Sequence, residues 1–264
     1  MVMIEIKKYK FYMDKNVKKN LDIIKNKAIP KKWDAVFIVN GMEGAGKTTF
    51  AAQCALYLDP TFNLDRCVFT SRDFLKAIDE APPESSILWD EAIRGAKVNQ
   101  HASTISQSIV NKLTMIRKKR LKIFACFPYL YMLNKYFVSR CISSFYIYAL
   151  DFDKRGYLKM YSKNQTELIY DMMKIKYKYN HRSAYYKVRG MMASFGKTFC
   201  LPELEYEDKK DKATLEGDKK MPPEEFWVLV HHVCKKKKWM AQRDVGEMIN
   251  IPQSTISTKI RNIP

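Results

Sequence analysis

One segment near residue 40 constrains the fold of this chain more than any other. Residues 35–40 read AVFIVN, an apolar run with the length of a buried strand. This run leads without a break into GMEGAGKT, and the residues from Gly46 to Leu58 form an alanine-rich helical pattern. A strand, a glycine-rich turn and a helix in immediate succession are typical of proteins in which helices cover a parallel sheet.

The glycine-rich turn predicts binding of a nucleoside triphosphate. Gly41 to Thr48 matches the pattern G-x-x-x-x-G-K-[ST] at every fixed position. In such a loop the backbone N–H groups point at phosphate oxygens, and the positive end of the following helix adds to the attraction. Lys47 is expected to reach the β and γ phosphates, and the Thr48 hydroxyl to bind Mg²⁺. The residues expected to contact the nucleotide are Gly41, Glu43, Gly44, Ala45, Gly46, Lys47, Thr48 and Thr49.

Two adjacent carboxylates supply a second part of the expected site. The apolar residues 87–89 (ILW) end in Asp90 and Glu91. This arrangement resembles the additional-strand class of P-loop ATPases, in which the first acid supports Mg²⁺ and the second polarises the attacking water. The resemblance implies that Asp90 joins Thr48 at the metal, and that Glu91 and Lys47 are catalytic. ATP and Mg²⁺ are therefore the expected cofactors and ATP hydrolysis the expected activity. The plainer alternative is that the two acids cap the next helix.

Phosphoryl transfer also requires positive charge near the γ phosphate. The candidates are Arg117, Arg120 and Arg140, which lie before or between the later strands of the pattern. In ring ATPases such a residue often comes from a neighbouring subunit. For each arginine alone, a solvated surface cation is the simpler interpretation.

The remaining apolar pattern predicts an α/β fold of the P-loop NTPase type, a mostly parallel sheet with helices on both faces. Further strands are expected at residues 67–70, 86–91, 121–127 and 142–150, with helices between them. Residues 156–162 are expected to add an edge strand and residues 165–178 a helix. Residues 179–201 give no clear pattern.

Changes in composition divide the chain into four parts. Residues 1–32 contain ten lysines from Lys7 onward, with scattered apolar residues that could form one amphipathic helix, and are expected to form a basic arm or a solvated face. The ATPase domain is expected to span 33–201. Residues 202–223 are nearly all charged or turn-forming and indicate a solvated linker. Residues 224–264 are expected to fold as a small all-α domain.

This last part resembles the helix-turn-helix of bacterial and archaeal DNA-binding regulators. Residues 242–249 and 253–262 are expected to be its two helices, with 224–236 as a supporting helix. Apolar side chains at Val245, Met248, Ile251, Ile256 and Ile260 fall where crossing helices bury contacts. The residues left to face a DNA major groove are Gln253, Ser254, Thr255, Ser257, Thr258 and Lys259. A helical bundle used for protein contact is the alternative.

The charge of the chain favours a polyanionic partner. Lysine and arginine total 47 against 28 acidic residues, a net charge of +19. Nucleic acid is the usual partner of such a surface, although a lysine-rich proteome would give the same count. The six cysteines form no C-x-x-C pair, which favours reduced thiols. No run of 18 apolar residues occurs, so we expect no transmembrane segment and a cytoplasmic protein, in the host cytoplasm if it is viral.

Residues 121–148 carry a further resemblance. They follow the basic run 117–120 and show a strand, Pro128, a short helix and another strand. This looks like the second half of the FtsK and HerA group of DNA-pumping ATPases and of the Zot-like ATPases of filamentous phages. One departure is that Cys126 and Phe127 replace the polar pair that senses the γ phosphate in those families. Gln100, Gln107 or another polar side chain would then have to act as the sensor, or the coupling of hydrolysis to movement differs.

The resemblance implies an ATP-driven motor or remodeller of double-stranded DNA in a virus or mobile element, serving packaging or transfer. Such motors are homo-oligomers, often hexameric rings. One alternative is a replication-associated ATPase, such as a helicase loader or initiator. Another is a sequence-specific regulator with an ATPase switch. A Zot-like assembly protein at a membrane is disfavoured because no transmembrane helix is expected. A packaging enzyme with its own nuclease is disfavoured because no nuclease domain with clustered acids is evident after Asp151.

Overall fold

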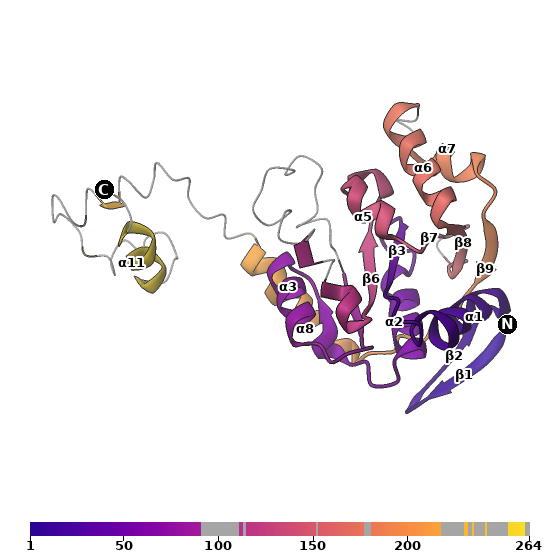
Figure 1. Ribbon diagram of the computed structural model, residues 1–264, viewed down its shortest axis with the longest axis horizontal. Helices are drawn as coiled ribbons and strands as arrows, with labels where there is room; N and C mark the ends of the chain where they lie inside the picture. The colour runs from indigo at the N-terminus through magenta and orange to yellow at the C-terminus, as the bar shows by residue number, and fades with distance from the viewer. Residues whose placement is uncertain are drawn as a thin grey trace. The chain divides into compact units, whose positions relative to one another are not determined.

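The computed structural model describes residues 1–90, 111–112, 115–151, 153–176, 181–217, 230–231, 234, 241 and 253–261. The chain divides into two compact units, Met1–Thr214 and Leu215–Pro264 (Figure 1). The first unit contains the glycine-rich loop and the second the predicted DNA-binding segment.

The first unit is built on a mixed α/β architecture with a mostly parallel sheet, which confirms the predicted fold class at this level. In the described part of the chain, seven strands pair in the order β4-β5-β6-β3-β7-β8-β9. Their bounds are β3 Ala35–Gly41, β4 Cys67–Val68, β5 Ser86–Trp89, β6 Lys122–Phe127, β7 Ser143–Tyr148, β8 Tyr157–Ser162 and β9 Met191–Ser194. The first five strands are parallel, while β8 and β9 are antiparallel additions. Strand β6 lies between β3 and β5.

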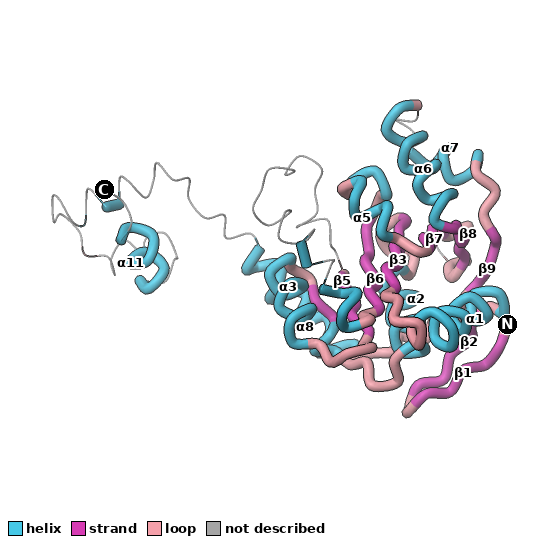
Figure 2. The backbone as a smooth tube through the Cα atoms, in the orientation of Figure 1, coloured by secondary structure: helices cyan, strands magenta, loops and turns pink. Residues whose placement is uncertain are grey.

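Helices cover both faces of this sheet (Figures 1 and 2). Their bounds are α1 Lys15–Ile23, the π-helical η1 Ile24–Ala28, α2 Lys47–Leu58, the 3₁₀ turns η2 Leu64–Arg66 and η5 Leu130–Met132, α3 Ser71–Glu80, α5 Lys135–Arg140, α6 Lys163–Ile175, α7 His181–Lys187 and α8 Glu203–Gly217. Successive residues of β3 face opposite cores, since Phe37 packs with α1 and α2 whereas Ile38 packs with α3, α5, α6 and α7. This explains why β3 is apolar throughout rather than alternating.

Helix α2 lies against the sheet directly behind the glycine-rich loop. Gly46, with φ of 96°, precedes its first turn, and Ala51, Ala52 and Ala55 are completely buried. Small side chains let the helix axis approach the strands closely, and Phe50 fills the remaining space against Phe145 with ring centroids 4.9 Å apart. The sheet and α2 therefore hold the loop between two rigid elements.

The structure corrects the expectation of a basic arm at residues 1–32. Strands β1 (Val2–Ile6) and β2 (Tyr9–Met13) form an antiparallel hairpin, and α1 follows directly. Phe11, Met13 and Leu21 are each 1% exposed and belong to the core shared with α2. The lysines lie mainly at solvent positions between these apolar residues, and α1 is an amphipathic helix that follows a hairpin rather than part of an extended arm.

The structure also corrects the expectation of a linker over residues 203–217, while residues 218–223 of the predicted linker lie outside the described residues. Residues 203–217 form helix α8, whose first part belongs to the first unit. Tyr206 is 4% exposed, and the Lys209 ammonium donates to the carbonyls of Leu64 and Cys67, both at 2.8 Å. Few apolar side chains of α8 reach the core, so the helix has almost no apolar periodicity. Its composition therefore resembles that of a linker, although Glu, Lys, Ala and Leu are good helix formers.

In the second unit the structure describes helix α11, Gln253–Arg261, where the sequence predicts a helix over 253–262. Ile256 and Ile260 are buried, while Gln253, Ser254 and Thr258 are exposed. Thr255 and Ser257 are half-buried. The predicted helix 242–249 and the turn at 250–252 lie outside the described residues, as does the side chain of Lys259. Of the predicted supporting helix 224–236, the structure describes only residues 230, 231 and 234. The described helices include none long and apolar enough to span a membrane.

Candidate nucleotide-binding site

The glycine-rich loop connects the end of β3 to the start of α2. Its path depends on Gly41, whose φ is 144°, a value that residues with a side chain rarely adopt. A β carbon at Gly41 would lie 2.0 Å from the backbone oxygen of Ile147 in β7. The absence of a side chain therefore lets the loop leave β3 while β3 stays paired to β7.

The Lys47 side chain turns back into the loop. Its ammonium donates to the carbonyl oxygens of Gly41 at 3.0 Å and Met42 at 2.8 Å. A positive charge is thus held at the N-terminal end of α2, where the backbone N–H groups already favour an anion. This combination fits the phosphates of a nucleotide.

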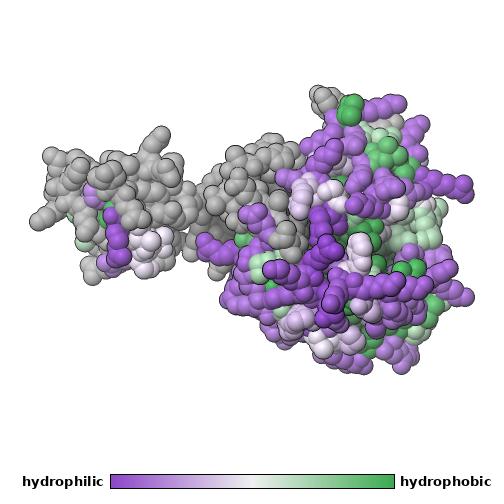
Figure 3. Space-filling view, in the orientation of Figure 1, coloured by the Kyte–Doolittle hydropathy of each residue, from purple (hydrophilic) through white to green (hydrophobic). Residues whose placement is uncertain are grey.

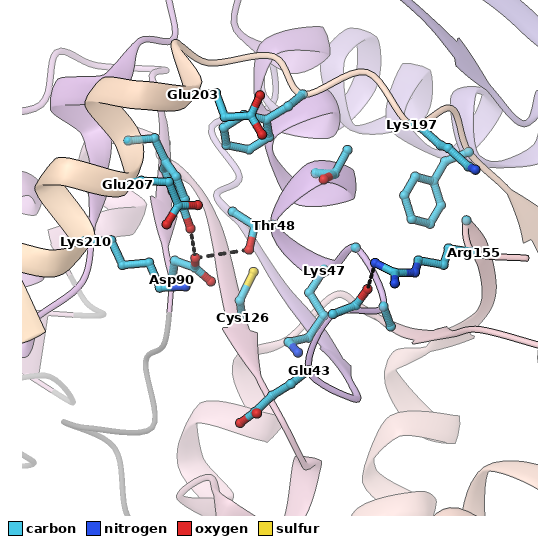
Figure 4. A pocket seen from close by; sticks show the side chains of 18 of the residues that line it. Glu43, Lys47, Thr48, Asp90, Cys126, Arg155, Lys197, Glu203, Glu207 and Lys210 are labelled. Atoms are coloured by element: carbon cyan, nitrogen blue, oxygen red, sulfur yellow. Dashed lines mark hydrogen bonds between the residues drawn. The ribbon is translucent and has the colours of Figure 1, made fainter. Parts of the chain in front are cut away.

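The two motifs predicted from the sequence meet in space (Figure 4). Thr48, in the first turn of α2, donates from Oγ1 to Oδ2 of Asp90 at 3.0 Å. Asp90 directly follows β5 and is 3% exposed. A third group, the hydroxyl of Tyr206 from α8, donates to the same carboxylate oxygen. Burial and the Asp90 charge together raise the pKa of Tyr206 far above its usual value, so this hydroxyl keeps its proton.

The donor set of this cluster fits Mg²⁺. A hydroxyl and a carboxylate are hard oxygen ligands, and Mg²⁺ usually takes only one or two protein ligands and completes its shell with waters and phosphate oxygens. Across the described residues no three His, Cys, Asp or Glu side chains gather as a metal cage would require. Thr48 and Asp90 would hold the ion beside the loop, where it would neutralise phosphate charge.

A cavity of about 990 Å³ opens in front of the loop. From the predicted set, its lining includes the consecutive residues Glu43, Gly44, Ala45, Gly46, Lys47, Thr48 and Thr49, together with Asp90. Gly41 contributes instead through its carbonyl contact with Lys47. Glu91, the expected catalytic acid, lies outside the described residues, next to Asp90.

Cys126 occupies the cavity wall at the end of β6. In the sequence, Cys126 is one of two residues at the position where the resemblance implies a polar sensor of the γ phosphate. Burial and the nearby Asp90 charge raise the pKa of the Cys126 thiol, which is therefore neutral. Gln100 and Gln107, the alternative sensors, lie outside the described residues.

The three arginines proposed from the sequence do not lie near the loop of their own chain. Arg140 pairs with Asp34 at 2.5 Å and Arg120 with Glu84 at 2.9 Å, while the Arg117 guanidinium lies over the ring of Trp33. Trp33 and Asp34 precede β3, and Glu84 precedes β5, so these contacts lie at the amino ends of parallel strands. The loop follows the carboxyl end of β3. Strand direction therefore separates these arginines from the site.

Other charged residues, which the sequence analysis missed, line the cavity instead. Arg155, in the loop between β7 and β8, donates to the carbonyl oxygen of Gly44 at 3.2 Å (Figure 4). Lys197 follows β9, and α8 contributes Glu203, Glu207 and Lys210. These segments have no periodic sequence pattern that would indicate a site. They reach the loop because β8 and β9 add to the sheet beside β7, and because α8 packs near the loop.

No family model and no curated protein matches the chain. Among solved structures, the N-terminal domain of zonular occludens toxin from Neisseria meningitidis is similar at 17% identity, with a TM-score of 0.37 over 49% of this chain and 84% of that one. The genome packaging NTPase B204 from Sulfolobus turreted icosahedral virus 2, in complex with ATP-gammaS, is similar at 11% identity, with a TM-score of 0.35 over 50% of this chain and 94% of that one. Similarities of this size do not assign the chain to a family.

Proposed function

We propose that this chain binds Mg²⁺·ATP at the loop and hydrolyses it. The observation that carries the proposal is the hydrogen bond from Thr48 to Asp90, which joins residues 42 positions apart in the sequence. The loop alone could bind any phosphate-containing ligand, whereas the Asp90 carboxylate beside the Thr48 hydroxyl adds a pair of oxygen ligands for a metal ion. In this site Lys47 would bind the phosphates, Thr48 and Asp90 would hold Mg²⁺, and Glu91 would polarise the attacking water.

We propose that ATP hydrolysis drives the movement or remodelling of double-stranded DNA. The net charge of +19 favours a polyanion, and hydrophilic side chains cover most of the visible face of the first unit (Figure 3). In the second unit α11 has the buried Ile256 and Ile260 on one side and exposed polar residues such as Ser254 on another, as a recognition helix requires. A cytoplasmic homo-oligomeric ring that serves DNA packaging or transfer in a virus or mobile element fits this combination.

The charge and α11 also support a helicase loader or a DNA-binding regulator, so the experiment must separate these functions. ATP turnover is measured without DNA, with single-stranded DNA and with long double-stranded DNA, and Glu91→Gln provides the background. A motor predicts turnover stimulated several-fold by long duplex of any sequence. The full-length double variant Ser254→Asp, Thr258→Glu places negative charge on α11 and is expected to reduce DNA affinity but not maximal stimulation. Negligible turnover on every DNA, together with tight duplex binding that this double variant abolishes, would contradict the motor.

Arg155 is expected to contribute to nucleotide affinity. Its guanidinium contacts the loop at Gly44 and lines the cavity, so we expect it to pair with phosphate oxygens. Arg155→Ala should lower ATP affinity about tenfold, as the loss of one charge-assisted hydrogen bond would. Lys154→Ala is the matched control, because the adjacent Lys154 pairs with Asp151 at 3.4 Å. Isothermal titration of both variants with Mg²⁺·ATP gives the comparison, and an equal loss in both would indicate only a general charge effect.

A further inference from the structure

Helix α8 places a side chain against the carboxylate of Asp90, and the proposed function gives this contact no role. Tyr206 projects from its first turn and is 4% exposed. Its ring packs against Phe199 and Phe69, with centroid distances of 5.0 and 5.4 Å. The hydroxyl at the end of this fixed ring meets Oδ2 of Asp90, the oxygen that also accepts from Thr48. The Asp90 carboxylate therefore has two donors, from two different helices.

A second contact fixes α8 in place one turn further along. The Lys209 ammonium donates to the carbonyls of Leu64 and Cys67. Cys67 begins β4 and is paired with Leu88 of β5, the strand that leads to Asp90. Lys209 thus attaches α8 to the same edge of the sheet that carries the metal carboxylate, and this attachment determines where Tyr206 lies.

We infer that Tyr206 is a positioning residue for Asp90, and that the Mg²⁺ site is coupled through this hydroxyl to the placement of α8. This inference rests on the proposed binding of Mg²⁺·ATP. The hydroxyl fixes the rotamer of the carboxylate, so that its orientation toward the ion is set before the ion arrives. Partners that orient a metal ligand typically contribute 10-fold to 100-fold to metal affinity or activity. Linkage is reciprocal, so binding of Mg²⁺·nucleotide must in turn hold α8 in place.

The test is equilibrium binding of a fluorescent ATP analogue to the full-length protein, in EDTA and across a Mg²⁺ titration. Tyr206→Phe keeps the ring and removes the hydroxyl. It should raise the Mg²⁺ concentration at half-saturation about tenfold and leave binding in EDTA unchanged. Lys209→Met should act in the same direction by loosening α8. The double variant should show less than the sum of the two effects, because both act through one contact.

Lys212→Met is the matched control, because Lys212 is an exposed lysine of the same helix. It should leave the Mg²⁺ titration unchanged. A half-saturation value for Tyr206→Phe within twofold of the wild-type value would overturn the inference, since a purely structural hydroxyl changes thermal stability but not metal affinity. If the wild-type protein binds no nucleotide in either condition, the proposed function itself fails, and the EDTA arm distinguishes the two results.

Amide hydrogen exchange of the wild-type protein provides a readout that needs no variant. Exchange in residues 203–214 should slow when Mg²⁺·ATPγS is bound and remain unchanged with the same nucleotide in EDTA. If residues 203–214 exchange equally fast with Mg²⁺·ATPγS and with ATPγS in EDTA, the Mg²⁺ site is not coupled to α8. This result needs no variant, so it holds even if Tyr206→Phe folds poorly.

Discussion

Replacement of Lys47 by methionine is expected to lower the affinity for Mg²⁺·ATP by about 100-fold or more while the protein stays folded. The large effect follows from position, because the ammonium is held over the loop by the Gly41 and Met42 carbonyls, beside the N-terminal end of α2. Loss of a charged partner from a desolvated phosphate contact costs roughly 2–5 kcal/mol, which corresponds to a factor of about 30 to several thousand. Methionine keeps the length of the aliphatic chain, so packing changes little.

Isothermal titration with Mg²⁺·ATP measures this loss, and thermal unfolding without nucleotide measures stability. The contacts of Lys47 with the Gly41 and Met42 carbonyls are part-buried and exposed, so water can replace the ammonium there and the melting temperature should change only slightly. Lys76→Met is a suitable control, since Lys76 is an exposed lysine of α3 that pairs weakly with Glu80 at 3.8 Å. If Lys47→Met binds ATP within threefold of the wild-type protein, the loop is not the nucleotide site.

The parts of the site that could be predicted are those encoded by contiguous residues. The loop from Gly41 to Thr48 and the strand that ends at Asp90 are local patterns, because each reports a short element together with the chemistry at its end. Their meeting through Thr48 follows from the parallel sheet, since carboxyl ends of parallel strands share an edge. By the same rule Arg140, which precedes β7, lies at the opposite edge from the loop of its own chain.

The parts that could not be predicted are those that depend on long-range packing. Arg155 reaches the loop because β8 returns antiparallel to β7, and nothing within its own segment shows this. Residues 179–201 contain α7 and β9, and β9 is held by β8, the predicted edge strand, rather than by an apolar pattern of its own. Tyr206 is a single aromatic residue among charges. Because the sequence around Tyr206 was interpreted as a linker, its contact with Asp90 was not predicted.

The loop should also be vulnerable at its first glycine, independently of any ligand. Gly41→Ala is expected to lower the stability of the nucleotide-free protein by roughly 3 kcal/mol or more, because the new methyl group would meet backbone rather than a movable side chain. Its β carbon would lie 2.0 Å from the Ile147 oxygen, at a φ of 144°. Relief of this clash requires β3 to separate from β7 at the end of the sheet that carries the loop. The melting temperature should fall by about 10 °C, given about 2–4 °C per kcal/mol for a unit of this size.

Gly44→Ala separates steric clash from backbone strain within the same loop. Gly44 also has a positive φ, 71°, but its β carbon would meet nothing within 4 Å. Its cost should be about 1–2 kcal/mol, the usual penalty for a side chain in the left-handed region. We therefore expect the melting temperature without nucleotide to be much lower for Gly41→Ala than for Gly44→Ala. Equal melting temperatures would show that β7 yields to the new methyl group, and that the close approach of Ile147 does not determine the path of the loop.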